Sequence, residues 1–177
     1  MPDRTPIDVT NLDGYGNPPL EWSRAHALLS APPDPDNPAG DSTIFLGTIR
    51  PDGRPHSAGI GALWHDGDYY IVSGPETQKS RNLAANPACT ISLSLKGMDL
   101  ILEGDALRVT DTPTLETLAA RYRDAGWPAQ AEGDAFTAPY SAPSAGPPPW
   151  YLYRFTIHTA YGVAGAEPPG ATRWRFE

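Results

Sequence analysis

The sequence predicts a mainly β, α+β protein, in which six to seven antiparallel strands and two or three short helices form a small β-barrel. Asp-Gly dipeptides twice separate two strand-like runs, in "RPDGRP" and "WHDGDY", which is the strongest short-range signal for a hairpin. The segment "ACTISLSLK" alternates apolar and polar residues, as a half-buried strand does. The 21 prolines favour strands and turns over long helices. Closing such a meander into a barrel would remove its exposed edges.

The first half of the chain supplies an arm, a helix and three strands. Residues 1–19 contain Pro, Asp, Asn and Gly without a period, and we expect them to form an extended N-terminal arm. A helix is predicted over 20–30, "LEWSRAHALLS", and the proline-rich segment 31–41 ends it. Residues 42–73 then form three antiparallel strands joined by the two Asp-Gly turns.

The second half alternates helices and strands up to a long connection. We expect a helix over 77–86, strands over 88–96 and 99–109, a helix over 111–126, a strand over 150–165 and a short last strand over 171–177. Gly104 marks a bulge or bend. Residues 126–149 are rich in Pro, Ala and Ser, and a loop of that length is either functional or poorly ordered. With 177 residues in all, residues 20–177 are predicted to form a single domain.

Composition excludes several classes of function. The formal net charge is −8 with a pI near 4.9, and no basic stripe is present to neutralise phosphates, so we expect no nucleic-acid partner. The apolar runs are too short to cross a membrane, and the N-terminus lacks the apolar core of a signal peptide. The single cysteine, Cys89, fits a buried strand thiol better than a reactive one. A soluble, cytoplasmic protein is therefore expected.

Known catalytic and metal-binding patterns are missing from the sequence. The histidines show no metal-ligand spacing, so no metal site is predicted: His26, His56, His65 and His158. The phosphate-loop, dinucleotide and serine-hydrolase motifs do not occur either. Asp99, Glu103 and Asp105 share one face of a strand, which is more typical of a solvated face than of acid–base catalysis. A protein of this kind leaves the chemistry to a cofactor.

The start of the helix over 77–86 is the first candidate site. Thr77 can cap the helix, which leaves the backbone N–H groups of the first turn pointing outward at the positive end of the helix dipole. Lys79 and Arg81 add two full charges, while Ser80 and Asn82 add neutral donors. Together these groups predict a binding corner for a phosphate or a carboxylate, and the alternative is a solvated helix face.

A second candidate surface lies one hairpin earlier, in "RPDGRPHSAGIG". Arg50, Arg54 and His56 bring three groups that can be cationic. Gly59 and Gly61 recur with the period of a strand and leave one face of it without side chains. Such a face lets a flat ligand lie against the backbone, and the alternative is a barrel corner that needs small residues.

These stretches together resemble a known superfamily. "TIRPDGRPHSAGI", "WHDGDYYIVSGP", "TQKSRNLAANP", "LEGDALRV" and "TRWRF" follow one another with the order and spacing of the pyridoxamine 5′-phosphate oxidase-like split β-barrels, or flavin/deazaflavin oxidoreductases. The likeness covers residues 20–177 and is greatest to actinobacterial members that use the deazaflavin coenzyme F-420. It implies an FMN-binding split β-barrel that forms a homodimer, with the cofactor in a groove at the subunit interface.

The resemblance also implies roles for individual residues. The cofactor phosphate, or the acidic tail of a deazaflavin, would be held by Lys79, Arg81 and Asn82. Nearby donors would be Thr77, Gln78 and Ser80. The ring system would lie along the strand of His56, Ser57, Ala58, Gly59 and Ile60, beside Ser73 and Gly74. From the other subunit, Trp174 and Arg173 would approach the ring or the substrate.

Departures from the family pattern narrow the expected activity. True pyridoxamine phosphate oxidases carry an arginine at the position of Gly59, and their C-terminal substrate residues are unmatched by "TRWRF", which argues against vitamin B6 oxidation. Many relatives carry proline and tryptophan in place of Gly59 and Gly61, and the change either widens the pocket or weakens cofactor binding. The segment 126–149 is unusual for the family and is a candidate lid.

The leading hypothesis is an oxidoreductase that moves a hydride between bound deazaflavin or FMN and a small unsaturated or carbonyl substrate. The deazaflavin is preferred because the strand arginine is missing. A proton would come from solvent, Tyr140 or His56, among which the sequence does not choose. The alternatives are a non-catalytic split barrel that binds a flavin, haem or tetrapyrrole, and a barrel with a degraded site that serves as an interaction domain.

Overall fold

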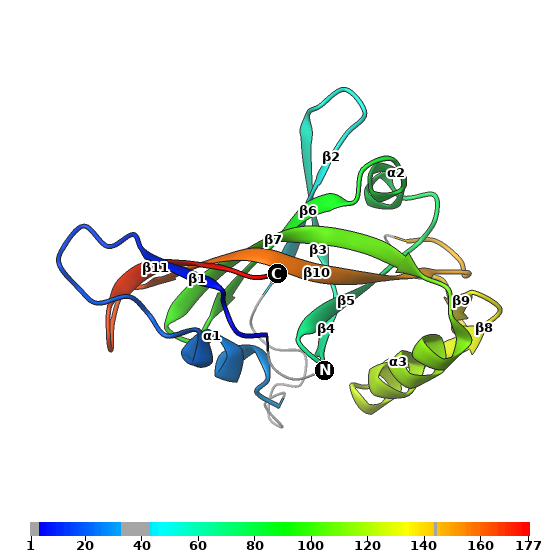
Figure 1. Cartoon of the computed structure of the whole chain (residues 1–177). Helices are drawn as coiled ribbons and strands as arrows, with labels where there is room; N and C mark the ends of the chain where they lie inside the picture. Colours follow the sequence, from blue (N-terminus) through cyan, green and yellow to red (C-terminus); the bar gives the residue numbers. More distant parts are fainter. Residues whose placement is uncertain (1–3, 33–42, 144) are drawn as a thin grey trace.

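The computed structural model describes residues 4–32, 43–143 and 145–177 and contains eleven strands and three helices within them (Figure 1). The strands are β1 (Asp8–Asn11), β2 (Ile44–Ile49), β3 (Pro55–Ile60), β4 (Ala62–His65), β5 (Asp68–Ser73), β6 (Ala88–Leu95), β7 (Met98–Val109), β8 (Gln130–Glu132), β9 (Ala135–Thr137), β10 (Tyr151–Ala164) and β11 (Gly170–Arg175). The helices are α1 (Trp22–Leu29), α2 (Gln78–Ala85) and α3 (Thr112–Asp124).

One nine-stranded sheet organises the fold, and β7 and β10 run through its middle (Figure 1). Its main path is β1-β11-β10-β7-β6-β2-β3, while β5 pairs with both β10 and β4. The first half of β10 pairs with β5 and the second half with β11, so this strand joins the two parts of the sheet. A register shift between Ile157 and Thr159 separates two stretches of its pairing with β7.

The predicted fold class is confirmed, with two corrections. The protein is mostly antiparallel β with three helices, which is the split-barrel type. The sheet, however, is not closed: its path ends at β3, because β4 leaves β3 at Gly61 and pairs with β5 only. The strand number was underestimated. β1, β8 and β9 are three or four residues long and too short to show a period, and the three strands expected over 42–73 are four, because the second is divided into β3 and β4 at Gly61.

The N-terminal arm is attached to the sheet edge. β1 pairs with β11, from Asp8 opposite Arg175 to Asn11 opposite Thr172. Helix α1 follows and packs its Trp22 ring against Trp174, with ring centroids 5.4 Å apart. These contacts tie the start of the chain to its end.

Apolar side chains form two clusters. The larger one lies within the sheet and beneath α1. The smaller one lies between α3 and the sheet, where Leu115 and Leu118 pack with Leu152 of β10. Since β10 contributes to both clusters, its sequence is apolar on both faces instead of alternating cleanly.

Segment 126–149 has structure of its own, which the sequence did not predict. β8 and β9 form a hairpin within it, and Phe136 is fully buried in the smaller cluster. The turn between these strands contains Gly133 at a φ of +62°, a left-handed conformation that glycine adopts without strain. The segment therefore packs as a wall beside α3.

None of the helices in the described residues is both long enough and apolar enough to span a bilayer.

Candidate functional site

The start of α2 is fixed by three hydroxyl groups. Thr77 caps the helix as predicted: its Oγ1 accepts a hydrogen bond from the Ser80 backbone N–H at 3.3 Å and donates to the Gly74 carbonyl at 2.9 Å. Ser80 Oγ donates to Ser73 Oγ at 2.9 Å. The hydroxyl cluster thus holds the first turn of α2 against the end of β5.

Lys79 is the buried cation of this corner. Only 9% of the residue is exposed, and among the described residues its ammonium group has no hydrogen bond or salt bridge. Partial burial lowers the pKa of this group. Its charge is therefore uncompensated among the described residues and is available to an anion.

Arg81 and Asn82 do not join Lys79. The Arg81 guanidinium is exposed and bonds to the Glu76 carbonyl and to Gln78 Oε1, at 3.2 Å from the latter. Asn82 is fully buried, accepts from Gln78 Nε2 at 2.7 Å and donates to Thr48 Oγ1 at 2.9 Å. In this structure Asn82 therefore ties α2 to β2, and Arg81 lies along the helix surface.

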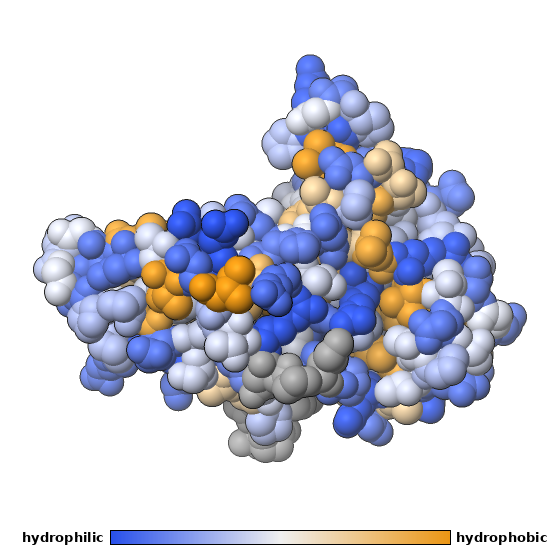
Figure 2. Space-filling model, viewed as in Figure 1, coloured by the Kyte–Doolittle hydropathy of each residue, from blue (hydrophilic) through white to orange (hydrophobic). Residues whose placement is uncertain are grey.

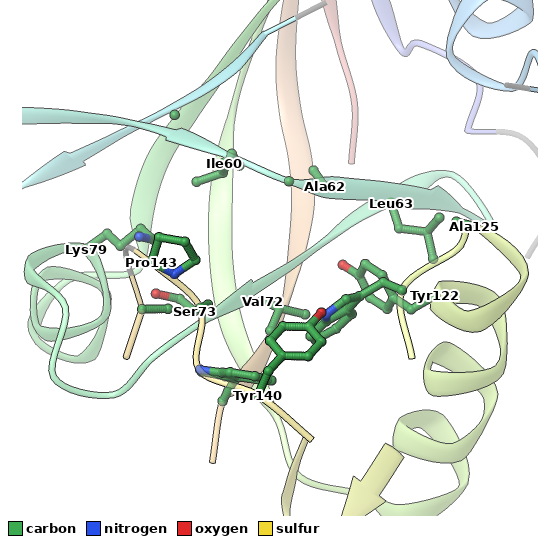
Figure 3. Close-up of a pocket in the computed structure, with 16 residues that line it drawn as sticks. Ile60, Ala62, Leu63, Val72, Ser73, Lys79, Tyr122, Ala125, Tyr140 and Pro143 are labelled. Carbon is green, nitrogen blue, oxygen red and sulfur yellow. The ribbon is translucent and has the colours of Figure 1, made fainter. Parts of the chain in front are cut away.

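Two cavities meet at Lys79. The first, called the chamber here, has a volume of about 500 Å³ and lies between the β3–β4 strands, β5, α3 and the segment 126–149 (Figure 3). Lys79 stands at one end of it, and Tyr122 of α3 and Ala125, the residue after this helix, stand at the other (Figure 3). The second, called the vestibule, has a volume of about 560 Å³ at the mouth of α2. Its walls include His56, Ala58, Thr77 and Gln78.

Gly59 at the end of β3 and Gly61 just after the strand have open space beside them. A Cβ added at Gly59 or Gly61 would have no atom within 4 Å, and neither backbone is left-handed. By contrast, a Cβ at Gly74 would collide with the Ala145 carbonyl group. Gly74 is thus required by packing within the chain, whereas Gly59 and Gly61 are not, and their bare backbone borders the chamber.

His56 lies in the vestibule with its charge suppressed. Burial lowers its pKa, and the nearby cations Arg50 and Lys79 lower it further. Its Nδ1 is 3.5 Å from Thr48 Oγ1. Thr48 Oγ1 also accepts from Asn82, so this hydroxyl links the His56 ring to the start of α2.

The remaining predicted residues are divided between the cavities and the outside. Ile60 and Ser73 line the chamber. Gly74 admits the backbone of Ala145, which borders both cavities. Ser57 is exposed on the other face of β3 and lines neither cavity.

The prediction that Trp174 reaches the site of another subunit is wrong for this structure. The Trp174 ring is fully buried in the core of its own chain, and its Nε1 donates to the Leu20 carbonyl at 3.2 Å. Gly162 makes room for it, since a Cβ there would lie 2.6 Å from the indole. Arg173 stays at the sheet edge, where its Nη2 donates to Thr10 Oγ1 at 3.0 Å.

Sequence reasoning missed most of the aromatic wall of the chamber. Four aromatic residues from α3 and the following segment line it: Tyr122, Trp127, Tyr140 and Trp150. The available signal was the aromatic residues dispersed through a proline-rich segment, which an ordinary exposed loop does not need. Among the described residues, no group of three or more His, Cys, Asp or Glu side chains is placed to hold a metal ion.

Comparison with known proteins identifies relatives of this fold. A family model described as pyridoxamine 5′-phosphate oxidase matches residues 38–163, more than two thirds of the chain. No curated protein matches the sequence.

Solved structures share the fold at low sequence identity. A NimC/NimA family protein from Clostridium acetobutylicum is 17% identical, with a TM-score of 0.54 over 84% of this chain and 91% of that one. An F420 reductase is 19% identical, with a TM-score of 0.51 over 76% and 94% of the two chains. A pyridoxamine 5′-phosphate oxidase-related, FMN-binding protein from Nostoc punctiforme is 17% identical, with a TM-score of 0.51 over 75% and 79%.

Proposed function

Because the chain belongs to the pyridoxamine 5′-phosphate oxidase family, we propose that it is an oxidoreductase that transfers a hydride between a bound flavin-type cofactor and a small organic substrate. The observation that carries the proposal is Lys79, a residue that is 9% exposed and whose ammonium group has no hydrogen bond or salt bridge among the described residues. It borders both cavities, at the positive end of α2.

The residues of the site fit such a cofactor. The phosphate or acidic tail of the cofactor would be held in the vestibule by Lys79 and by the N–H groups of the first turn of α2. His56, Ala58 and Gly59 of β3 border the vestibule, and the absence of a side chain at Gly59 leaves room for a flat ring along this strand. Glu76 also lines the vestibule, and its negative charge opposes the binding of a dianion. The backbone N–H groups of α2 are therefore needed, in addition to Lys79, to hold the anion there.

The cofactor, when bound, supplies hydride chemistry that the side chains of this site do not offer. The chain itself orients the reactants and keeps water away from them. Two groups can deliver a proton at the site: the Tyr140 hydroxyl beside the chamber and His56 Nε2 in the vestibule. The lowered pKa of His56 makes its imidazolium a stronger acid than an ordinary histidine.

Of the two cofactors, we favour the deazaflavin F-420 over FMN. Gly59 stands where phosphate-gripping relatives carry an arginine, so the chain offers fewer cations for a compact phosphate. Arg54 is exposed on the β2–β3 turn and Arg50 lies beside it, where they are available to a longer acidic tail. The net charge of −8 acts against both cofactors and more strongly against the more anionic one, F-420.

We further propose that the protein acts as a homodimer. Exposed apolar side chains gather on the face of the sheet away from the core, with exposed fractions of 47% for Phe45, 45% for Ile101 and 54% for Val163. Hydrophobic surface also lies over β1 and β11, where Val9 is exposed (Figure 2). A second copy of the chain would cover such surface and close the vestibule, which is open in a single chain.

Titration of the purified protein with FMN and with F-420 tests the proposal. The binding signal is the fluorescence of the cofactor. Lys79→Met, which keeps the apolar stem but removes the charge, should weaken binding by at least about tenfold. Arg81→Gln is the matched control, because it removes one positive charge from the same helix outside both cavities, and it should change affinity by less than about threefold. Failure of the intact protein to bind either cofactor at micromolar concentration would refute the proposal.

A further inference from the structure

The chamber has two unlike walls. One wall is formed by the β3–β4 strands and β5, where Ile60, Leu63 and Val72 contribute apolar side chains and Gly59 and Gly61 contribute none. The opposite wall is built by the aromatic residues of α3 and the segment after it. A space bounded by apolar side chains on one side and by aromatic rings on the other favours an apolar, aromatic ligand.

The aromatic wall is a connected group of rings. Trp127 contacts Tyr122 edge to face, with centroids 5.2 Å apart, and lies 5.6 Å from Trp150 at a tilt of 45°. Tyr140 lies 6.1 Å from Trp150 at a tilt of 46°. Because the rings support one another in edge and tilted contacts, the wall offers ring faces and edges to a further aromatic ring.

Two of the polar groups on this wall have no hydrogen bond among the described residues. The Tyr122 hydroxyl donates to the Tyr70 carbonyl at 2.9 Å, and Trp150 Nε1 donates to the Gly146 carbonyl at 3.3 Å, so both are used by the fold. The Tyr140 hydroxyl and Trp127 Nε1 are not used in this way. Both can donate, so they suit a ligand with an acceptor oxygen.

Charge is confined to one end of the chamber. Of the described residues that line it, Lys79 is the only one that carries a charge, and it is shared with the vestibule. A cofactor anion held in the vestibule would satisfy this charge. The rest of the chamber would then be an unfavourable place for an ionised ligand group.

We propose that the chamber binds the substrate, and that the substrate is a neutral, planar aromatic compound with a carbonyl-type acceptor oxygen positioned by Tyr140. That the ligand is a substrate rests on the proposed function, whereas the class of ligand follows from the walls of the chamber alone. Tyr140 acts here as a positioning residue through its hydroxyl, and Trp127 supplies the second donor.

Calorimetric titration with three probes tests the ligand class without any turnover. The probes are a naphthyl methyl ketone, its fully saturated decalin counterpart, and naphthoate. The naphthyl ketone should bind at least about tenfold more tightly than either of the others, to cofactor-free and to cofactor-loaded protein alike. Tyr140→Phe should weaken the ketone by about fivefold and leave unsubstituted naphthalene unchanged, whereas Tyr15→Phe, at a fully exposed position, should change neither.

A chamber-filling variant separates substrate binding from cofactor binding. Ala125→Leu enlarges a side chain that lines the chamber at the end remote from Lys79 and does not border the vestibule, so the protein should fold and bind cofactor as before while losing the ketone. Ala166→Leu, an equal change at an exposed position that lines neither cavity, is the matched control.

Each outcome bears on a different claim. Equal binding of the saturated ketone, or tighter binding of naphthoate, would overturn the ligand class. Competitive displacement of the ketone by cofactor would show that the chamber is the cofactor seat and overturn the assignment to substrate. Binding of the ketone by a protein that binds neither cofactor would support the ligand class and refute the proposed function alone.

Discussion

Two oppositely charged residues are largely buried near the two ends of β5, and only one of them is paired among the described residues. Asp68, at the start of the strand, is 1% exposed, and its carboxylate lies 2.6 Å from Arg154 Nε and 3.0 Å from Arg4 Nη2. Lys79, on the helix that follows the strand, is 9% exposed and has no such partner among the described residues. The carboxylate is compensated by two arginines of its own chain, while the ammonium group is not.

We interpret the difference as that between a structural charge and a charge that is available to a ligand. A charge that is removed from water must be paired or it destabilises the fold. Asp68 meets this requirement and joins the N-terminal arm to β10 through Arg4 and Arg154. Lys79 has no such compensation among the described residues, which is why it carries the proposed function, whereas Arg81 is exposed and bonds to its own helix.

The largest expected effect is on the paired charge. Asp68→Asn should lower the free energy of unfolding by about 3 kcal/mol, because it leaves Arg154 and Arg4 facing a neutral group and loosens the arm. Urea denaturation measures the change. Asp52→Asn, which breaks an exposed pair with Arg54, is the control and should change stability by less than about 0.5 kcal/mol. A similar loss in both variants would mean that Asp68 is no more structural than a surface charge.

The next effect concerns the backbone that encloses Lys79. Gly74→Ala places a methyl group against the Ala145 carbonyl and should destabilise the protein by about 2 kcal/mol. Ala145 borders both cavities, so moving it away should also expose Lys79 to water. Gly59→Ala is the control, because its Cβ meets open space and should change stability by less than about 0.5 kcal/mol. Thermal unfolding compares the two, and equal losses would contradict the packing argument.

A smaller effect of opposite sign is expected at Lys79. Lys79→Met should raise the free energy of unfolding of the cofactor-free protein by less than about 1 kcal/mol, because it replaces a partly buried, unpaired ammonium group with an apolar side chain. Urea denaturation without cofactor measures the gain, and Arg81→Gln should show none. If Lys79→Met destabilised the protein instead, Lys79 would have a structural partner and the contrast with Asp68 would fail.

Much of the fold follows from local signals in the sequence. Both Asp-Gly turns were predicted correctly, between β2 and β3 and between β4 and β5, because Gly53 and Gly67 adopt the positive φ that such turns require. The Thr77 cap was also predicted correctly, since the side chain accepts from Ser80 N. Signals of this kind act within a few residues and do not depend on the rest of the chain.

The candidate site was predicted only in part. Lys79 and Arg81 were expected to hold one ligand together, yet residues two apart on a helix point about 200° away from each other, so only one of them can face the cavities. The sequence itself contained that information. The chamber wall did not follow from the sequence, because Trp127 and Tyr140 reach β3 only through the packing of α3 and the β8–β9 hairpin. Trp174 likewise became a core residue through its fit to Gly162 across β10 and β11.

The smallest expected effect is a pH dependence of protein stability that arises from Lys79 and not from Asp68. Burial lowers the pKa of Lys79 in the folded protein, so in the alkaline range between its folded and unfolded pKa values the unfolded chain binds more protons. Stability of the cofactor-free protein should therefore rise with pH in that window relative to Lys79→Met, by well under about 1 kcal/mol.

Cofactor affinity should fall as the pH rises through the same window, because a neutral amine does not attract an anion. Denaturation and cofactor titration at a series of alkaline pH values test the pair of trends, with Arg81→Gln as the control that should follow the unmodified protein in both. Asp68 is compensated by arginines of its own chain, so no anion needs to bind beside it. In Asp68→Asn, stability should therefore still rise with pH while cofactor affinity falls. Parallel trends in stability and affinity would mean that the charge of Lys79 is not reserved for a ligand.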